Sequence, residues 1–321
     1  MRNGRSNKAR STREPKKSGF ENLDVTLEYF SFITPEVNIS ISVETVQASK
    51  IVGTTTRPPL AGAWHRITTI AGNTFREAVR DRVLYNLVLF VLILTGAAVF
   101  IGELSGGQER KIIVDLGLSA MLIFGVFIAI FVGVGLVYKE IERRTVYAIF
   151  SKPVGRGEFL LGKYLGLCLT LLVNVAVMGA GVSLALIYVS GGVDPLALSI
   201  WPAILLIYVE LMILTAIALL FSSFSSPALS ALLTFFVFII GHFSADLKSL
   251  ANSMGGSAAR WLFAALYYLL PNLANLSFIT PAAHGQFPAT QQVVMVVLYS
   301  LVYIGVVLAA ATMIFRRRNF K

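Results

Sequence analysis

One acidic residue lies in the middle of a long apolar stretch, where acidic residues are rare. Glu210 is nine residues into the apolar stretch Trp201–Phe221, close to the middle of a segment long enough to cross a membrane as a helix. A charge at that depth costs at least about 2.5–3.5 kcal/mol, so Glu210 must be paired, be protonated or face a polar cavity. The sequence leaves two roles open for it: a structural partner within the bundle, or a place in a transport path.

No catalytic or metal-binding pattern accompanies this residue. The sequence contains neither a G-x-S-x-G nucleophile motif nor an H-E-x-x-H helix. The three histidines, His65, His242 and His284, are scattered and typical of local hydrogen-bonding residues. The single cysteine, Cys168, excludes an internal disulfide and a multi-cysteine metal site. We therefore expect neither an enzyme nor a cofactor or metal bound by this chain.

Two segments resemble nucleotide-binding motifs. Residues 104–108 read LSGGQ, the letters of the signature motif of ABC-type ATPases, which works only within a large soluble ATPase domain. The run Gly157–Tyr164 matches a phosphate loop until its last position, where Tyr164 replaces the Ser or Thr that binds magnesium. We interpret the first match as chance and the glycines of the second as helix-packing residues.

The composition requires that lipid solvates most of the chain. Of its 321 residues 56% are hydrophobic and 14% charged, whereas soluble domains have about 25% charged residues. Six stretches are long enough to cross a membrane: Val83–Ile101, Leu118–Tyr138, Tyr164–Val189, Trp201–Phe221, Ala228–Ala245 and Val293–Phe315. The sequence therefore predicts an all-α integral membrane protein with six transmembrane helices. The stretch Trp261–Leu270 is too short to cross and predicts a half-crossing helix in the outer loop 246–292.

The distribution of basic residues predicts the orientation. If both termini are cytoplasmic, the inner segments 1–82, 139–163 and 316–321 hold 13, six and four Lys and Arg residues, against four on the outer side. A seventh span would place the basic tail Arg316-Arg317-Arg318 outside, which the positive-inside rule disfavours.

The region before the first span divides in two. Residues 1–60 are basic at their start and rich in Ser, Thr and Pro, which predicts a mobile cytosolic extension. From Trp64 onward, apolar residues recur at three- and four-residue steps up to Val79 opposite a basic face, which predicts an amphipathic helix in the cytoplasmic interface. We expect residues 61–321 to form one membrane domain.

Small residues recur at four-residue spacing, as in Gly162 with Gly166 and Gly305 with Ala309. This spacing allows close contact between helices. Whether the contacts form within one chain or between two stays open, and intrachain packing is the expectation.

The segment 139–163 carries six basic and three acidic residues and is too charged to be only a connector. Its alternation of charged and apolar residues indicates a short helix, ended by Pro153, that presents charge to a cytosolic partner. The run KEIERRTVYAIFSKPVGRGEFLLGKYLG resembles the corresponding segment of type 2 ABC exporter permeases: an acidic pair, a Thr, and Pro-x-x-Arg before a GKY-like start of the next span. The similarity covers residues 64–321.

The resemblance implies a permease subunit coupled to a separate cytosolic ATPase, which binds ATP and Mg. It implies two ATPases and two permeases, the second being an identical copy or a paralogue, in a prokaryotic inner membrane. It also implies which residues rest in a groove of the ATPase: Glu140, Glu142, Arg143, Thr145, Lys152, Pro153 and Arg156. Some members of this family support maturation of multicopper enzymes, and others export drugs, lipids or polysaccharides.

Two other functions fit an apolar bundle. A channel or secondary transporter that works without ATP predicts internal repeats and broken helices with polar groups at the midplane, of which Glu210 is the clear charged example. An intramembrane hydrolase needs a Ser-His or Asp pair at matched depth, and none is apparent.

Overall fold

The computed structural model describes residues 62–80, 89–90, 93–94, 97, 100–101, 106–142, 155–192, 195–244, 249 and 257–317. Within these ranges the chain forms helices and turns, and none of them contains a strand. Several predictions fall outside the described residues: the extension 1–60, most of the first span Val83–Ile101, and the coupling residues Arg143, Thr145, Lys152 and Pro153.

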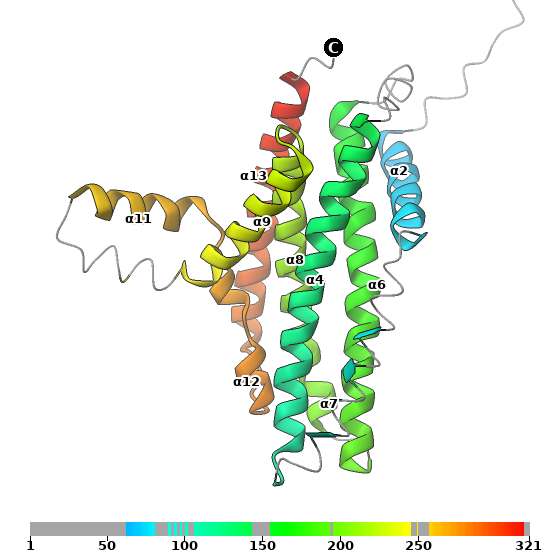
Figure 1. The fold of residues 1–321 in the computed structure, drawn as a ribbon, viewed down its shortest axis with the longest axis vertical. Coiled ribbons are helices and arrows are strands. Elements are labelled where there is room, and N and C mark those ends of the chain that lie inside the picture. Colours follow the sequence, from blue (N-terminus) through cyan, green and yellow to red (C-terminus); the bar gives the residue numbers. More distant parts are fainter. Residues whose placement is uncertain are drawn as a thin grey trace, which may run out of the picture. The chain divides into compact units, whose positions relative to one another are not determined.

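Four long helices lie side by side (Figure 1): α4 (Glu109–Glu142), α6 (Arg156–Ser190), α8 (Trp201–Ser222) and α13 (Thr290–Arg317). Each is long and apolar enough to cross a membrane. The shorter helices are α2 (Ala63–Ala78), α7 (Pro195–Ser199), α9 (Pro227–His242), α11 (Ser257–Leu269), η2 (Leu273–Leu276) and α12 (Ile279–Ala283).

The described part holds four candidate spans, or five if a bent pair of segments counts as one span. This pair, Arg260–Leu269 with Leu273–Ala283, bends by 44°. It lies where the sequence predicted the half-crossing helix, and α11 is that short helix. The total of six spans stays a prediction.

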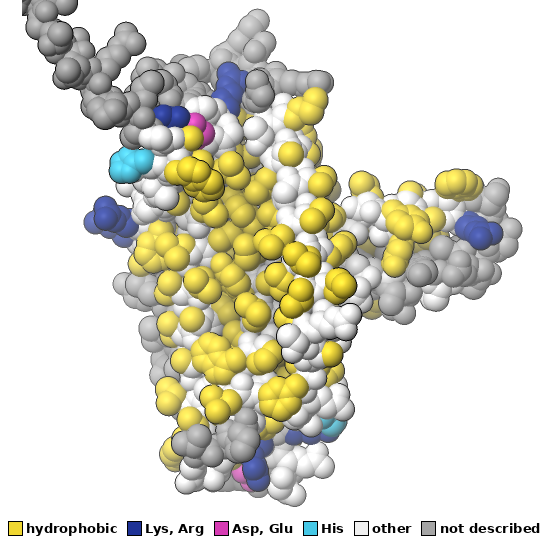
Figure 2. All heavy atoms as spheres, turned by 180° about the vertical axis from the view of Figure 1, so that it is seen from behind, with side chains coloured by type: hydrophobic (Ala, Val, Ile, Leu, Met, Phe, Trp, Pro, Cys, Tyr) yellow, Lys and Arg dark blue, Asp and Glu magenta, His cyan; other side chains and the backbone are white. Residues whose placement is uncertain are grey.

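Among the four long helices, α8 has the most buried apolar stretch. In α8 72% of the apolar stretch is buried within the chain, whereas in α13 only 22% is. The apolar side chains of α13 that remain exposed form part of a broad hydrophobic surface over the long helices, with charged side chains mainly near its two ends (Figure 2). This surface is typical of a multi-pass membrane protein whose outer face is solvated by lipid.

Helices extend into both ends of the segment 139–163. Helix α4 continues past Tyr138 to Glu142, and α6 begins at Arg156, eight residues before the predicted span. Charged residues did not end these helices because Lys, Glu and Arg are good helix formers. Only residues 143–155 therefore separate α4 from α6.

Helix α9 is the shortest helix that matches a predicted span, Ala228–Ala245. Its 16 residues rise about 24 Å, less than the hydrocarbon core of about 30 Å. Its end packs tightly on residues 271–276, which we call the return segment. A Cβ atom on Gly241 would lie 2.8 Å from Leu273 Cγ and 3.0 Å from the carbonyl oxygen of Pro271. The end of α9 therefore lies against the short helix η2.

Candidate functional site

Helix α2 packs closely along the first half of α6 (Figure 1), and two glycines of α6 make this possible. A Cβ atom on Gly162 would lie 2.7 Å from Cβ of Ile70, and one on Gly166 would lie 2.6 Å from both the carbonyl oxygen of Ala71 and Cβ of Thr74. Any larger side chain would push the helices apart. The helix-packing interpretation of these glycines is confirmed.

A bidentate ion pair ties α2 to the first turn of α6. The Arg66 guanidinium donates from Nε to Glu158 Oε2 at 2.9 Å and from Nη2 to Oε1 at 2.7 Å. Glu158 Oε2 also accepts from the backbone N–H of Gly155 at 3.2 Å and so caps the start of α6. Glu158 precedes the apolar stretch that begins at Tyr164, and the hydrogen bonds from Arg66 hold the pKa of its carboxyl below the ordinary value.

Further contacts extend this cluster to α13. The buried Lys163 ammonium lies 3.5 Å from Glu77 Oε2 on α2. On the other side of α6, the Arg156 guanidinium donates to the carbonyl oxygen of Phe315 at 3.3 Å, and the rings of Phe159 and Phe315 stack at 6.3 Å. A displacement applied to the start of α6 would therefore act on α2 and α13 as well.

We call this set of contacts the α6 hub, formed by Arg66, Glu77, Arg156, Glu158, Phe159, Lys163 and Phe315. Of the seven predicted coupling residues, Arg156 lies in the hub as the first residue of α6. Glu140 and Glu142 lie in the last turn of α4. The sequence assigned the charge of this segment to a partner protein, but Glu158 and Lys163 are bound within the chain.

The second polar site is the pair Glu210 and His242. Glu210 is fully buried in α8, and its Oε1 lies 3.5 Å from Nε2 of His242, the last residue of α9. Neither carboxylate oxygen nor Nε2 has a hydrogen-bond partner. Of the two roles that the sequence left open, the structure supplies a partner within the bundle. Helix α9 thus ends beside the tenth of the 22 residues of α8.

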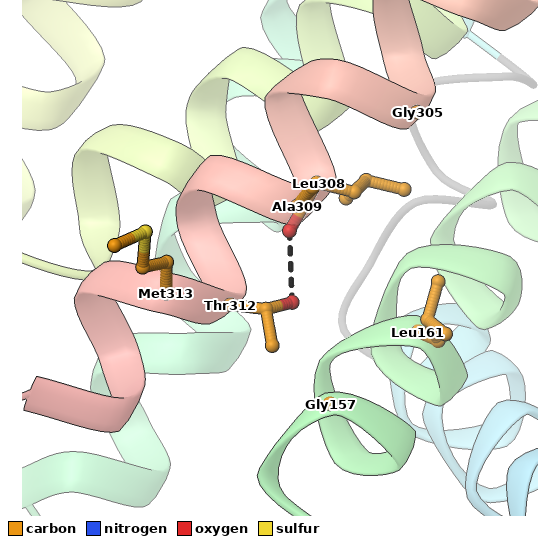
Figure 3. Close-up of a pocket in the computed structure, with 7 residues that line it drawn as sticks. All are labelled: Gly157, Leu161, Gly305, Leu308, Ala309, Thr312 and Met313. Atoms are coloured by element: carbon orange, nitrogen blue, oxygen red, sulfur yellow. Dashed lines mark hydrogen bonds between the residues drawn. The ribbon is translucent and has the colours of Figure 1, made fainter.

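An apolar groove of about 800 Å³ lies between the start of α6 and the end of α13 (Figure 3). Its lining consists of Gly157, Leu161, Gly305, Leu308, Ala309, Thr312 and Met313. The Thr312 hydroxyl donates to the carbonyl oxygen of Leu308 at 2.8 Å, so its polar atom is satisfied. A Cβ atom on Gly305 would meet nothing within 4 Å in the part of the chain that the structure describes, so the described helices do not provide the expected intrachain packing of this glycine.

Comparison with known proteins identifies the class of molecule. The profile of a family described as ABC-2 family transporter protein matches residues 68–320. The chain belongs to this family. It is also 28% identical over 273 residues to a Pseudomonas aeruginosa protein named "Probable ABC transporter permease protein NosY", and the match covers 78% of this chain and 98% of the relative.

Membership of the ABC-2 family confirms the resemblance to type 2 ABC permeases. It supports a role as a transport permease, a transmembrane subunit of the kind that generally works with an ATPase partner. The apolar helices agree with this role, since they make the chain a multi-pass membrane protein. Among the described residues there is no group of three or more His, Cys, Asp or Glu that could hold a metal ion.

Proposed function

We propose that the chain is the transmembrane permease subunit of an ATP-driven exporter, coupled to a separate cytosolic ATPase. ATP and Mg are bound by that ATPase, and this chain carries no cofactor. Both of its termini face the cytoplasm of a prokaryotic inner membrane. This orientation places the charged segment from Lys139 to Lys163 on the side where ATP is available.

The α6 hub is the observation that carries this proposal. Coupling requires an element whose equilibrium is biased both by the nucleotide state of the ATPase and by the cargo. Residues 143–155 lead directly into α6, whose first turns bind α2 through Glu158 and α13 through Arg156. The 35 residues of α6 rise about 52 Å, so a push at its start reaches the opposite side of the membrane.

The proposal includes a second permease, either an identical copy or a paralogue. Helix α13 supports it, because most of its apolar stretch is not covered by the chain and the small residues Gly305 and Ala309 face the open groove (Figure 3). Small residues at this spacing allow close approach of another helix in a membrane.

The test is to purify the chain with the cytosolic protein that it retains and to measure ATP hydrolysis. Arg143→Glu should reduce the amount of retained ATPase several-fold, because it reverses charge in the predicted docking segment. Lys111→Glu is the matched control, because it also replaces a positive charge by a negative one. Lys111 is exposed near the start of α4, on the predicted outer side, and this variant should retain ATPase like wild type.

Equal retention by both variants would reject the docking segment. Accessibility labelling gives an independent test, since single cysteines at positions 143–154 should react with an impermeant reagent only from the cytoplasmic side. Labelling from the outer side would reject the exporter altogether.

A channel or secondary transporter without ATP is the second candidate. The observation in its favour is the Glu210–His242 pair beside the end of α9, because broken helices with polar groups near the midplane are typical of secondary transporters. Flux through the purified chain without any ATPase would select it.

A further inference from the structure

The Glu210–His242 pair lies where the helical structure is interrupted inside the bundle. The end of α9 contacts η2 through Gly241, and the Ser244 hydroxyl donates to Oδ1 of Asn272 at 2.6 Å. Irregular backbone at membrane depth is tolerated only where it is buried in protein or lines a cavity. The pair therefore lies at a joint where α8, α9 and the return segment meet. A movement of α9 at this joint would make or break the contact between Glu210 and His242.

The hydrogen positions in this pair follow from its geometry. Nδ1 of His242 lies 3.2 Å from the carbonyl oxygen of Phe238, and because a carbonyl only accepts, Nδ1 carries a hydrogen. In a neutral ring Nε2 is then a lone-pair acceptor that faces Oε1 of Glu210 at 3.5 Å. An ionised carboxylate would face that lone pair without any donor, since neither of its oxygens has a hydrogen-bond partner.

The described apolar stretches of the helices around Glu210 supply no charge that could neutralise its carboxylate. Residues 116–138, 164–190 and 290–315, the apolar stretches of α4, α6 and α13, contain no Lys, Arg, Asp or Glu, and neither does η2. The titratable side chains of the surrounding helices are tyrosines and Cys168. Three of the hydroxyls already donate to carbonyl oxygens: Tyr164 to Met212, Tyr208 to Cys168, and Tyr303 to Leu269.

We propose that Glu210 and His242 form a proton-binding site that holds α9 on α8. The proton resides on the Glu210 carboxyl, whose Oε1 faces Nε2 of His242 as its acceptor at 3.5 Å, and the pair is electrically neutral. The joint can then open without exposing a charge to the membrane, because each partner leaves as a neutral group. A proton can enter or leave the site only when α9 moves away, since Glu210 is completely buried here. This proposal does not depend on the energy source of transport.

Infrared spectroscopy of the full chain in lipid vesicles tests the site without a known cargo. At pH 7 the wild type should show the C=O stretch of a protonated carboxylic acid, which shifts in D₂O, although an exposed Glu is ionised at this pH. Glu210→Gln should lose this band completely, which assigns it. If wild type and Glu210→Gln show the same acid bands at pH 7, Glu210 is ionised and the proposal is overturned.

The role of His242 is tested by two variants of that residue. His242→Phe removes the acceptor, so the acid band should remain but move to higher frequency, because a free carboxyl has a stronger C=O bond than a hydrogen-bonded one. His242→Gln keeps an acceptor of similar reach and should give a smaller shift, and it serves if the first variant fails to fold, as judged by circular dichroism. A band unmoved in a folded variant would show that the proton is not shared with His242.

Discussion

The molecule uses acidic residues in two different ways, at the start of α6 and in the middle of α8. Glu158 is about one-fifth exposed and receives two short hydrogen bonds from Arg66. Glu210 is buried, and its nearest titratable partner, His242, lies 3.5 Å away without a hydrogen bond. The first contact is an ion pair that is partly exposed to solvent, whereas the second is buried on the Glu210 side and contains no Arg or Lys.

The difference shows what each contact can do. An ion pair with a bidentate arginine fixes the relative orientation of two helices, so the α6 hub is suited to transmit movement. A neutral pair that shares one proton is directional but carries no uncompensated charge when it separates, so the joint at α9 is suited to open. The proposed exporter needs one region that transmits movement and another that opens. The following variants test whether the α6 hub and the joint at α9 divide these roles.

The largest effect is expected from Gly166→Leu, which breaks the contact between α2 and α6. Its Cβ alone would lie 2.6 Å from the backbone oxygen of Ala71, which cannot move away as a flexible side chain can. Overpacking of this kind costs about 1–3 kcal/mol or more. The free energy of unfolding in mixed detergent micelles should fall by about 3 kcal/mol.

The matched control is Gly305→Leu, a change of the same residue type on α13. A Cβ atom there meets nothing within 4 Å, so the unfolding free energy of a single chain should be nearly unchanged. If both variants were equally destabilised, the close approach of α2 to α6 would not be what holds the hub together.

A smaller effect is expected from His242→Leu, which leaves the carboxyl of Glu210 with no partner. Polar contacts between membrane helices contribute about 1–2 kcal/mol, and the unfolding free energy should fall by about this amount. The double variant Glu210→Leu/His242→Leu should recover most of the loss, because replacing both partners by apolar groups removes the unsatisfied carboxyl. An additive double variant would mean that the two side chains do not interact.

The two regions also differ in how far the sequence could predict them. Small residues at four-residue spacing identified Gly162 and Gly166 as packing residues, because helix geometry places such residues on one face. The same rule failed for Gly305, since spacing alone does not reveal whether another helix is present. Arg66 and Glu158 are 92 residues apart, and no local pattern connects them.

Glu210 was noticed from the sequence because a carboxylate in an apolar stretch is costly. Its partner was missed because His242 lies on another helix, and because its depth depends on where α9 ends, which hydropathy does not give. The segment 139–163 was predicted to form a short helix ended by Pro153, because charged and apolar residues alternate in it. Charge reports solvation rather than backbone conformation, and both flanking helices extend into it.

The smallest effect, and the one that separates charge from packing in the hub, is expected from Glu158→Gln. The pKa of Glu158 is lowered in the folded protein by the hydrogen bonds from Arg66, so its contribution to stability is present above the ordinary pKa of about 4.3 and is lost as the pH falls through the lower folded value. The unfolding midpoint of wild type should exceed that of Glu158→Gln by a constant small amount from pH 8 to about 5 and converge with it once the pH falls below the lowered pKa of the folded state. High salt should also reduce the difference, because the pair is partly exposed.

Arg66→Gln should reproduce both trends, since it removes the same pair from the other side. A difference that persisted at low pH would show that Glu158 acts through packing, and α2 would then be held on α6 by the glycine contacts without help from charge.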